Sequence, residues 1–159
     1  MKAYTEKELT LKAETYCASA ERCPSDLEEK LRKWGASEDT LARVMAHLVE
    51  ERYLDTTRYS RFFTRDKYRF NQWGRMKIIQ ALRMRHVPAE DIEVGLEEID
   101  AQEYDNILRD LLEKKARSLK AASDYERNTK LVRFAAGRGF TMDEIMRHIR
   151  QGGFDEYPD

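Results

Sequence analysis

Apolar residues recur along most of the chain at spacings of three and four, which is the period of an amphipathic helix. In residues 37–53, for example, Leu41, Val44, Met45 and Leu48 fall on one face. The pattern predicts nine helices, which cover residues 5–22, 25–35, 37–53, 55–70, 73–86, 88–99 and 101–121 and two further segments that begin at Ser123 and Thr141. No segment shows the alternation of a half-buried strand, so the sequence predicts an all-α fold.

Short polar motifs mark where several of these helices begin. A hydroxyl residue followed three positions later by a glutamate is a capping box, which satisfies backbone N–H groups at a helix start. The motif occurs at Ser25–Glu28, Ser123–Glu126 and Thr141–Glu144. Gly35 stands where the second helix is expected to end, because glycine is favoured just past a helix C-terminus.

The helices fall into three similar sets of three. The apolar residues Leu27, Leu31, Ala36, Leu41 and Met45 align with Ile78, Leu82, Val87, Ile92 and Leu96 at an offset of 51 residues, and with Leu131, Ala135, Phe140, Ile145 and Ile149 at an offset of 104 residues. The turn between the second and third helix of each set also aligns, with Gly35, His86 and Gly139 in register. A period near 50 residues indicates a repeat protein. We therefore predict three tandem three-helix, helix-turn-helix-like repeats over residues 1–54, 55–100 and 101–155.

Composition and charge refine this picture. Hydrophobic residues make up 41% of the chain and charged residues 37%, a balance that suits several small cores in an elongated array better than one thick core. The net charge of −1 conceals blocks of opposite sign. Residues 58–86 carry nine Arg or Lys against Asp66, residues 88–113 carry ten acids against Arg109, and residues 114–150 carry ten bases against four acids. Either these are ordinary solvated helix faces, or two basic surfaces flank an acidic one.

Several functional classes find no support in the sequence. Cys17 and Cys23 match neither a disulfide framework nor a zinc spacing. The charged N-terminus does not resemble a signal peptide, and no run of about 18 apolar residues could cross a membrane, so we expect a cytoplasmic protein. The histidines His47, His86 and His148 belong to no catalytic or metal-binding motif. We therefore expect no enzymatic activity, no metal and no cofactor.

A basic face is the strongest candidate for a functional surface. At about 100° per residue, a helix over residues 55–70 places Arg58, Arg61, Arg65, Tyr68 and Arg69 on one side and Tyr59, Phe62, Phe63 and Phe70 on the other. We expect the aromatic side to enter the core and the arginine side to face solvent. On the next helix Lys77, Gln80 and Arg83 are expected outside. Guanidinium groups bind phosphates and carboxylates alike, so the partner is either nucleic acid or an acidic protein surface.

The middle repeat resembles the RecX family of recombination regulators. Members typically begin this repeat with Leu-Asp-Asp, followed by two further residues, an aromatic residue and Ala. Later in the repeat they show a Gly with basic residues and an Ile, and then a Leu and a Lys-Gly-Ile turn. The matching residues here are Leu54, Asp55, Tyr59, Gly74, Arg75, Lys77, Ile78 and Leu82. The chain departs at Thr56, at Ser60 and at the turn Arg85-His86-Val87. The first repeat fits through Leu31–Gly35, and the third fits only in its pattern.

The resemblance implies a curved, elongated molecule that binds in the groove of the RecA–DNA filament. It implies inhibition of the ATPase, recombinase and coprotease activities of RecA, with no catalysis by this chain, which is expected to be monomeric when free. The residues then expected to contact RecA or DNA are Arg58, Arg61, Arg65, Arg69, Arg75, Lys77 and Arg83. The alternative is a helix-turn-helix-like protein that binds DNA directly.

Overall fold

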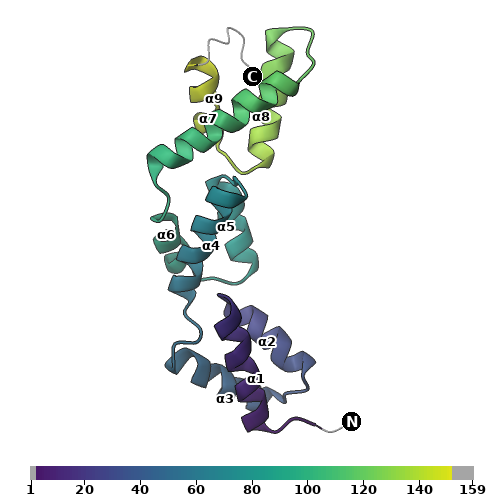
Figure 1. The fold of residues 1–159 in the computed structure, drawn as a ribbon, viewed down its shortest axis with the longest axis vertical. Coiled ribbons are helices and arrows are strands. Elements are labelled where there is room, and N and C mark those ends of the chain that lie inside the picture. The colour runs from purple at the N-terminus through teal and green to yellow at the C-terminus, as the bar shows by residue number, and fades with distance from the viewer. Residues whose placement is uncertain (1–2, 152–159) are drawn as a thin grey trace. The chain divides into compact units, whose positions relative to one another are not determined.

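The computed structural model describes residues 3–151, and within them it contains nine α-helices and no strand (Figure 1). The helices are α1 (Glu6–Ser19), α2 (Pro24–Lys33), α3 (Glu38–Glu50), α4 (Thr56–Phe70), α5 (Arg75–Met84), α6 (Ala89–Leu96), α7 (Ala101–Ser118), α8 (Asp124–Gly137) and α9 (Met142–Gln151). The prediction of an all-α fold is confirmed. The predicted helices are present, and most are a few residues shorter than the periodicity suggested.

The chain forms two compact units, as far as the structure describes them. The first comprises residues 1–62 and 82–95, and the second comprises residues 63–81 and 96–159. In the first unit α1, α2 and α3 enclose a core of Leu9, Ala13, Cys17, Leu27, Leu31, Leu41, Val44, Leu48 and Leu54. In the second unit α8 packs against both α7 and α9. The division into three repeats at residues 54 and 100 therefore stays a prediction about sequence units.

The repeat alignment corresponds to a shared turn geometry. Gly35, His86 and Gly139 all adopt positive φ, at 89°, 60° and 101° respectively. In each turn the next residue's N–H donates to the carbonyl five residues earlier: Ala36 to Leu31 at 2.9 Å, Val87 to Leu82 at 3.1 Å and Phe140 to Ala135 at 3.2 Å. This is the hydrogen bond of a Schellman motif, which needs a left-handed residue at its bend. The aligned apolar positions are buried, except Ala36, Met45 and Leu96, which are half-buried.

Most predicted helix starts are confirmed, and one is wrong. Thr141 and Glu144 form the expected capping box, with the Thr141 N–H donating to Glu144 at 2.8 Å and the Glu144 N–H to Thr141 at 3.2 Å. Ser25, however, does not cap α2. Pro24 occupies the first helical position and has no N–H, so the cap is Cys23, whose N–H donates to the Asp26 carboxylate at 3.2 Å. The Ser25 hydroxyl instead donates to the carbonyl of Arg85 at 3.2 Å.

A backbone-to-backbone contact within the second unit joins the start of α5 to the α8–α9 turn. The N–H of Gly74 donates to the carbonyl of Arg138 at 2.8 Å, and the N–H of Met76 donates to the carbonyl of Gly139 at 3.0 Å. A Cβ atom added to Gly74 would overlap the backbone of Gly139 and Phe140. The two segments can therefore approach this closely only because Gly74 has no side chain.

Replacing His86 by glycine should stabilise the protein. His86 has a left-handed backbone at a turn where the other repeats carry glycine, and a left-handed conformation costs a non-glycine residue about 1–2 kcal/mol. We expect His86→Gly to raise the free energy of unfolding by about 0.5–1 kcal/mol in urea titrations. The matched control is Gly35→Ala, where nothing lies within 4 Å of the new methyl group and only the φ of 89° opposes it. The control should be less stable than the unmodified protein, and destabilisation by His86→Gly would contradict the argument.

Replacing Gly74 by alanine should destabilise the second unit. The new Cβ would force the backbone segments apart, and we expect a decrease of about 2–4 kcal/mol in the free energy of unfolding, which is the range of severe local disruptions. Gly137→Ala is the matched control, because Gly137 lies at the end of α8 with nothing within 4 Å of the added Cβ. Alanine is favoured over glycine in helices, so the control should be neutral or more stable. Equal effects of the two substitutions in thermal unfolding would refute the close approach at Gly74.

Candidate functional site

The arginines of α4 lie on its solvent-exposed side. Arg58, Arg61, Arg65 and Arg69 are all exposed, as the helical period predicted. Because they recur at spacings of three and four, they form one stripe along the helix. The charge that this stripe can offer to a partner depends on how many of the arginines form ion pairs with acids of the same chain.

The predicted inner side of α4 is partly wrong. Phe62 and Phe70 were expected in the core, yet their exposed fractions are 46% and 79%. Tyr68 was expected outside and is fully buried. The buried face instead contains the small residues Ser60 and Thr64.

Close packing and hydrogen bonding explain the inner face that α4 adopts. A Cβ atom added to Gly95 of α6 would overlap Ser60, so the two helices approach closely through small residues. The Tyr68 ring can be buried because its hydroxyl lies 3.4 Å from the carbonyl oxygen of Glu98 and accepts from the N–H of Asp100 at 3.4 Å. A prediction that assigns aromatic residues to the buried face of a helix takes account of neither the close packing at Ser60 nor the hydrogen bonds of Tyr68.

Two arginines of the α4 stripe form ion pairs with acids of other helices or connections. Nε of Arg58 donates to Oε1 of Glu21 at 2.6 Å, and its Nη atoms donate to the carbonyls of Arg52 and Tyr53. Nε of Arg69 donates to Oε1 of Glu103 at 2.8 Å. Arg58 therefore links the start of α4 to the connection that precedes it and to Glu21, and Arg69 links α4 to α7. Both charges are compensated within the chain.

The basic residues at the start of α5 are also engaged. The guanidinium carbon of Arg75 lies 4.8 Å from the ring centroid of Tyr104, and its Nε lies 3.8 Å from Oε2 of Glu144. The ammonium of Lys77 lies 4.6 Å from the ring centroid of Trp73. These cation–π contacts leave Arg75 and Lys77 half-buried.

Tyr104 is the centre of the polar network beneath Arg75. Its hydroxyl accepts from the N–H of Arg75 at 3.0 Å and donates to the Glu144 carboxylate at 3.2 Å. Burial raises the pKa of Tyr104 above its ordinary value, so the hydroxyl keeps its proton and remains a donor even in alkaline solution. The network joins α5, α7 and α9 within the second unit, and Arg75 is part of it.

Arg65 and Arg83 are the members of the predicted set that make neither an ion pair nor a cation–π contact among the described residues. Both side chains are exposed. Among the residues that the structure describes, no acid lies within ion-pair distance of either guanidinium. Arg61 is likewise exposed. The predicted basic face thus separates into Arg58, Arg69, Arg75 and Lys77, which make ion pairs or cation–π contacts within the chain, and Arg65 and Arg83, which make neither among the described residues.

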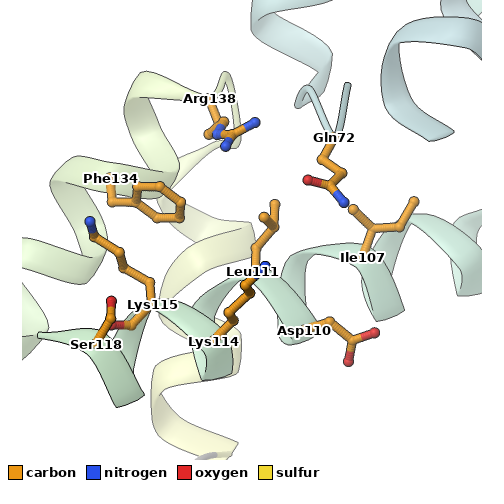
Figure 2. A pocket seen from close by; sticks show the side chains of 9 residues that line it. All are labelled: Gln72, Ile107, Asp110, Leu111, Lys114, Lys115, Ser118, Phe134 and Arg138. Atoms are coloured by element: carbon orange, nitrogen blue, oxygen red, sulfur yellow. The ribbon is translucent and has the colours of Figure 1, made fainter. Parts of the chain in front are cut away.

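Sequence reasoning missed a pocket in the second unit. It is lined by Gln72, Ile107, Asp110, Leu111, Lys114, Lys115, Ser118, Phe134 and Arg138, and it has a volume of about 340 Å³ (Figure 2). The excess of basic residues over 114–150 was a signal for it. The grouping of these cations around Phe134 requires the packing of α7 on α8 and could not be read from the sequence.

Within residues 3–151, no three His, Cys, Asp or Glu side chains come together in a way that could hold a metal ion. The same part of the chain has no helix long and apolar enough to cross a membrane.

Known proteins resemble the chain in sequence and in structure. The family model for the second three-helix domain of RecX matches residues 56–96, and the model for the third three-helix domain matches residues 102–149. The regulatory protein RecX of Pseudomonas fluorescens is 34% identical over 133 residues, which cover 82% of this chain and 83% of that protein. The regulatory protein RecX of Chlorobaculum tepidum is 29% identical over 126 residues, which cover 79% of this chain and 76% of that protein.

A crystal structure of RecX from Lactobacillus salivarius has the same fold, with a TM-score of 0.80 and 18% identity over 92% of this chain and 95% of that one. The domain matches, the 34% identical relative and the repeated three-helix architecture agree with one another. The chain therefore belongs to the RecX family of regulatory proteins.

Proposed function

We propose that this protein regulates RecA by binding the RecA–DNA filament and inhibiting its ATPase, recombinase and coprotease activities. Membership of the RecX family is the observation that carries this proposal. The protein acts as a monomer in the cytoplasm, by occupying a binding surface, and catalyses no reaction itself.

The uncompensated arginines supply contacts of the right chemistry for such a partner. A filament of protein on DNA presents phosphates and carboxylates, and arginine binds either group through two parallel N–H donors. Arg65 on α4 and Arg83 on α5 are exposed and make no ion pair among the described residues. Arg61 on α4 is exposed as well, but it already has a partner inside the chain. Arg58, Arg69, Arg75 and Lys77 belong to the proposed face in a supporting role, since their charges have partners inside the chain.

Repeated small units suit a polymeric target. When several weak contacts are linked in one chain, the second and third contacts form at a high effective concentration, so the total affinity exceeds that of each contact. The three-helix domains of the family place similar units in tandem along this chain. A regulator that touches more than one filament subunit gains affinity in this way.

Reversing the charge of Arg65 and Arg83 should impair inhibition without affecting folding. We expect the Arg65→Glu, Arg83→Glu double variant to need about tenfold more protein for half-inhibition of the RecA ATPase, which corresponds to about 1.4 kcal/mol of binding free energy. Exposed substitutions change stability by about 0.5 kcal/mol or less, so urea unfolding should be nearly unchanged. The measurement is steady-state ATP hydrolysis by RecA on single-stranded DNA over a titration of the regulator.

The control variant carries the same change of charge elsewhere. Lys7→Glu with Lys33→Glu replaces two exposed cations of α1 and α2, and it should inhibit as the unmodified protein does. Inhibition should also occur at concentrations where duplex DNA is hardly bound. Retardation of naked duplex DNA at the same concentrations, with a log–log salt slope near −0.9 for each phosphate bound, would favour direct DNA binding instead. An unimpaired arginine variant would show that α4 and α5 do not form the docking surface.

A further inference from the structure

The pocket of the second unit has a composition that the regulatory function does not explain. Its volume of about 340 Å³ is near the lower end of the range of about 300–1,000 Å³ found for ligand pockets. Figure 2 shows Phe134 and Arg138 projecting from α8 and its C-terminal end, with α7 supplying the facing wall and Gln72 closing one end.

The positive charges around the pocket are uncompensated. Within the part of the chain that the structure describes, no carboxylate lies within ion-pair distance of Lys114, Lys115 or Arg138. Arg138 is held in place by its Nη1 atom, which donates to the carbonyl of Asn71 at 3.0 Å. The acid in the lining, Asp110, lies 3.6 Å from Nε of Arg109, which offsets its charge. The pocket therefore favours an anion.

The remaining lining is apolar and aromatic. Ile107 and Leu111 line the pocket from α7, and the Phe134 ring lines it from α8. The ammonium of Lys115 lies 5.0 Å and the guanidinium carbon of Arg138 lies 5.5 Å from the centroid of that ring. Cations from two different elements thus flank one aromatic side chain. Gln72 and Ser118 add neutral groups that can donate and accept hydrogen bonds.

We infer that this pocket binds one nucleotide unit, with the base against Phe134 and Leu111 and the phosphates on Lys114, Lys115 and Arg138. A base offers a flat apolar face and a polar edge, which match the aromatic wall and the Gln72 amide. The phosphates that adjoin a base in a strand match the two cations that lie near the Phe134 ring. Stacking of bases on aromatic side chains combined with basic residues along the backbone is the general mode of single-strand recognition.

The size and lining of the pocket favour a single nucleotide unit over duplex DNA and over an acidic peptide. In a duplex the bases are stacked and paired, so none can enter a pocket of this size without unstacking. An acidic peptide would use the cations, but its carboxylate side chains offer no flat apolar face to cover Phe134 and Leu111. The nucleotide can come from a single strand or from a free nucleotide, since both offer a base joined to phosphate. The inference does not depend on RecA, because the ligand binds this chain alone.

Fluorescence anisotropy of a labelled thymidine 12-mer, titrated with the full chain in the absence of RecA, tests the inference. An abasic oligonucleotide of equal length keeps the phosphates and removes the bases, and it should bind at least about fivefold more weakly, because each stacked base contributes about 1–3 kcal/mol. Unlabelled dTMP and ATP serve as competitors. Competition by either would assign the site to free nucleotides as well as strands, and its absence would assign it to strands.

Pocket variants identify where the ligand binds. Phe134→Leu, with its fold checked by circular dichroism, should weaken binding of the 12-mer about fivefold or more. Lys114→Gln with Lys115→Gln should weaken it and reduce the salt slope by about 0.7 for each phosphate that the variant no longer neutralises. Lys7→Gln with Lys33→Gln is the charge-matched control and should bind as the unmodified protein does.

Three results would overturn the inference. They are equal binding of the abasic strand, equal weakening by the pocket and control lysine variants, and displacement of the 12-mer by a poly-glutamate peptide but not by an unlabelled single strand. Because no RecA is present, these results leave the inhibition of RecA as a separate question. A failure of the Arg65 and Arg83 variants in the ATPase measurement would likewise leave the nucleotide pocket untouched.

Discussion

The direct backbone contact between Gly74 and the Arg138–Gly139 turn is the constraint on which much of the second unit depends. Two N–H groups at the start of α5 find their acceptors in the α8–α9 turn, at 2.8 and 3.0 Å. This pairing satisfies donors that a helix start otherwise leaves without intrahelical partners. It also requires that Gly74 have no side chain, because a Cβ atom would overlap the facing backbone.

Both polar features of the second unit lie beside this contact. Arg75 follows Gly74 directly, and its N–H and guanidinium meet Tyr104 and Glu144. Gln72 and Arg138 lie on the two sides of the contact and line the pocket, with Arg138 bonded to the carbonyl of Asn71. One backbone pairing therefore adjoins both a polar network and a cationic pocket.

Charge in this protein serves two purposes that sequence composition does not separate. Arg58 and Arg69 bind Glu21 and Glu103, so they join helices to one another. Exposed ion pairs contribute little to stability, yet they remove a cation from the charge that a partner can use. Cations that have no acid within ion-pair distance among the described residues, such as Arg65, Arg83 and those of the pocket, are then the candidates for binding an anion. The near-neutral net charge of −1 is thus compatible with local surfaces that attract anions.

The sequence by itself determined the features that depend on neighbouring residues along the chain. Helical periodicity, the caps at Ser37, Ser123 and Thr141, and the left-handed turn at Gly35 and Gly139 each involve contacts within about one helical turn, so local propensity decides them. The alignment of His86 with those glycines also indicated a turn at which a non-glycine residue has a left-handed backbone. The resemblance to RecX was likewise present in the ordered apolar and glycine positions of the repeats.

Only the tertiary structure decided which side chains meet across the chain. The burial of Tyr68 in place of Phe62 and Phe70 follows from how closely α4 packs and from acceptors and donors thirty residues away, at Glu98 and Asp100. The partners of Arg58 and Arg69 lie 37 and 34 residues away, so no local pattern could separate them from Arg65. The pocket requires α7, α8 and the residue Gln72 to come together. Local sequence determines where helices begin and end, whereas packing between distant segments determines which charges are paired with an acid and which are not.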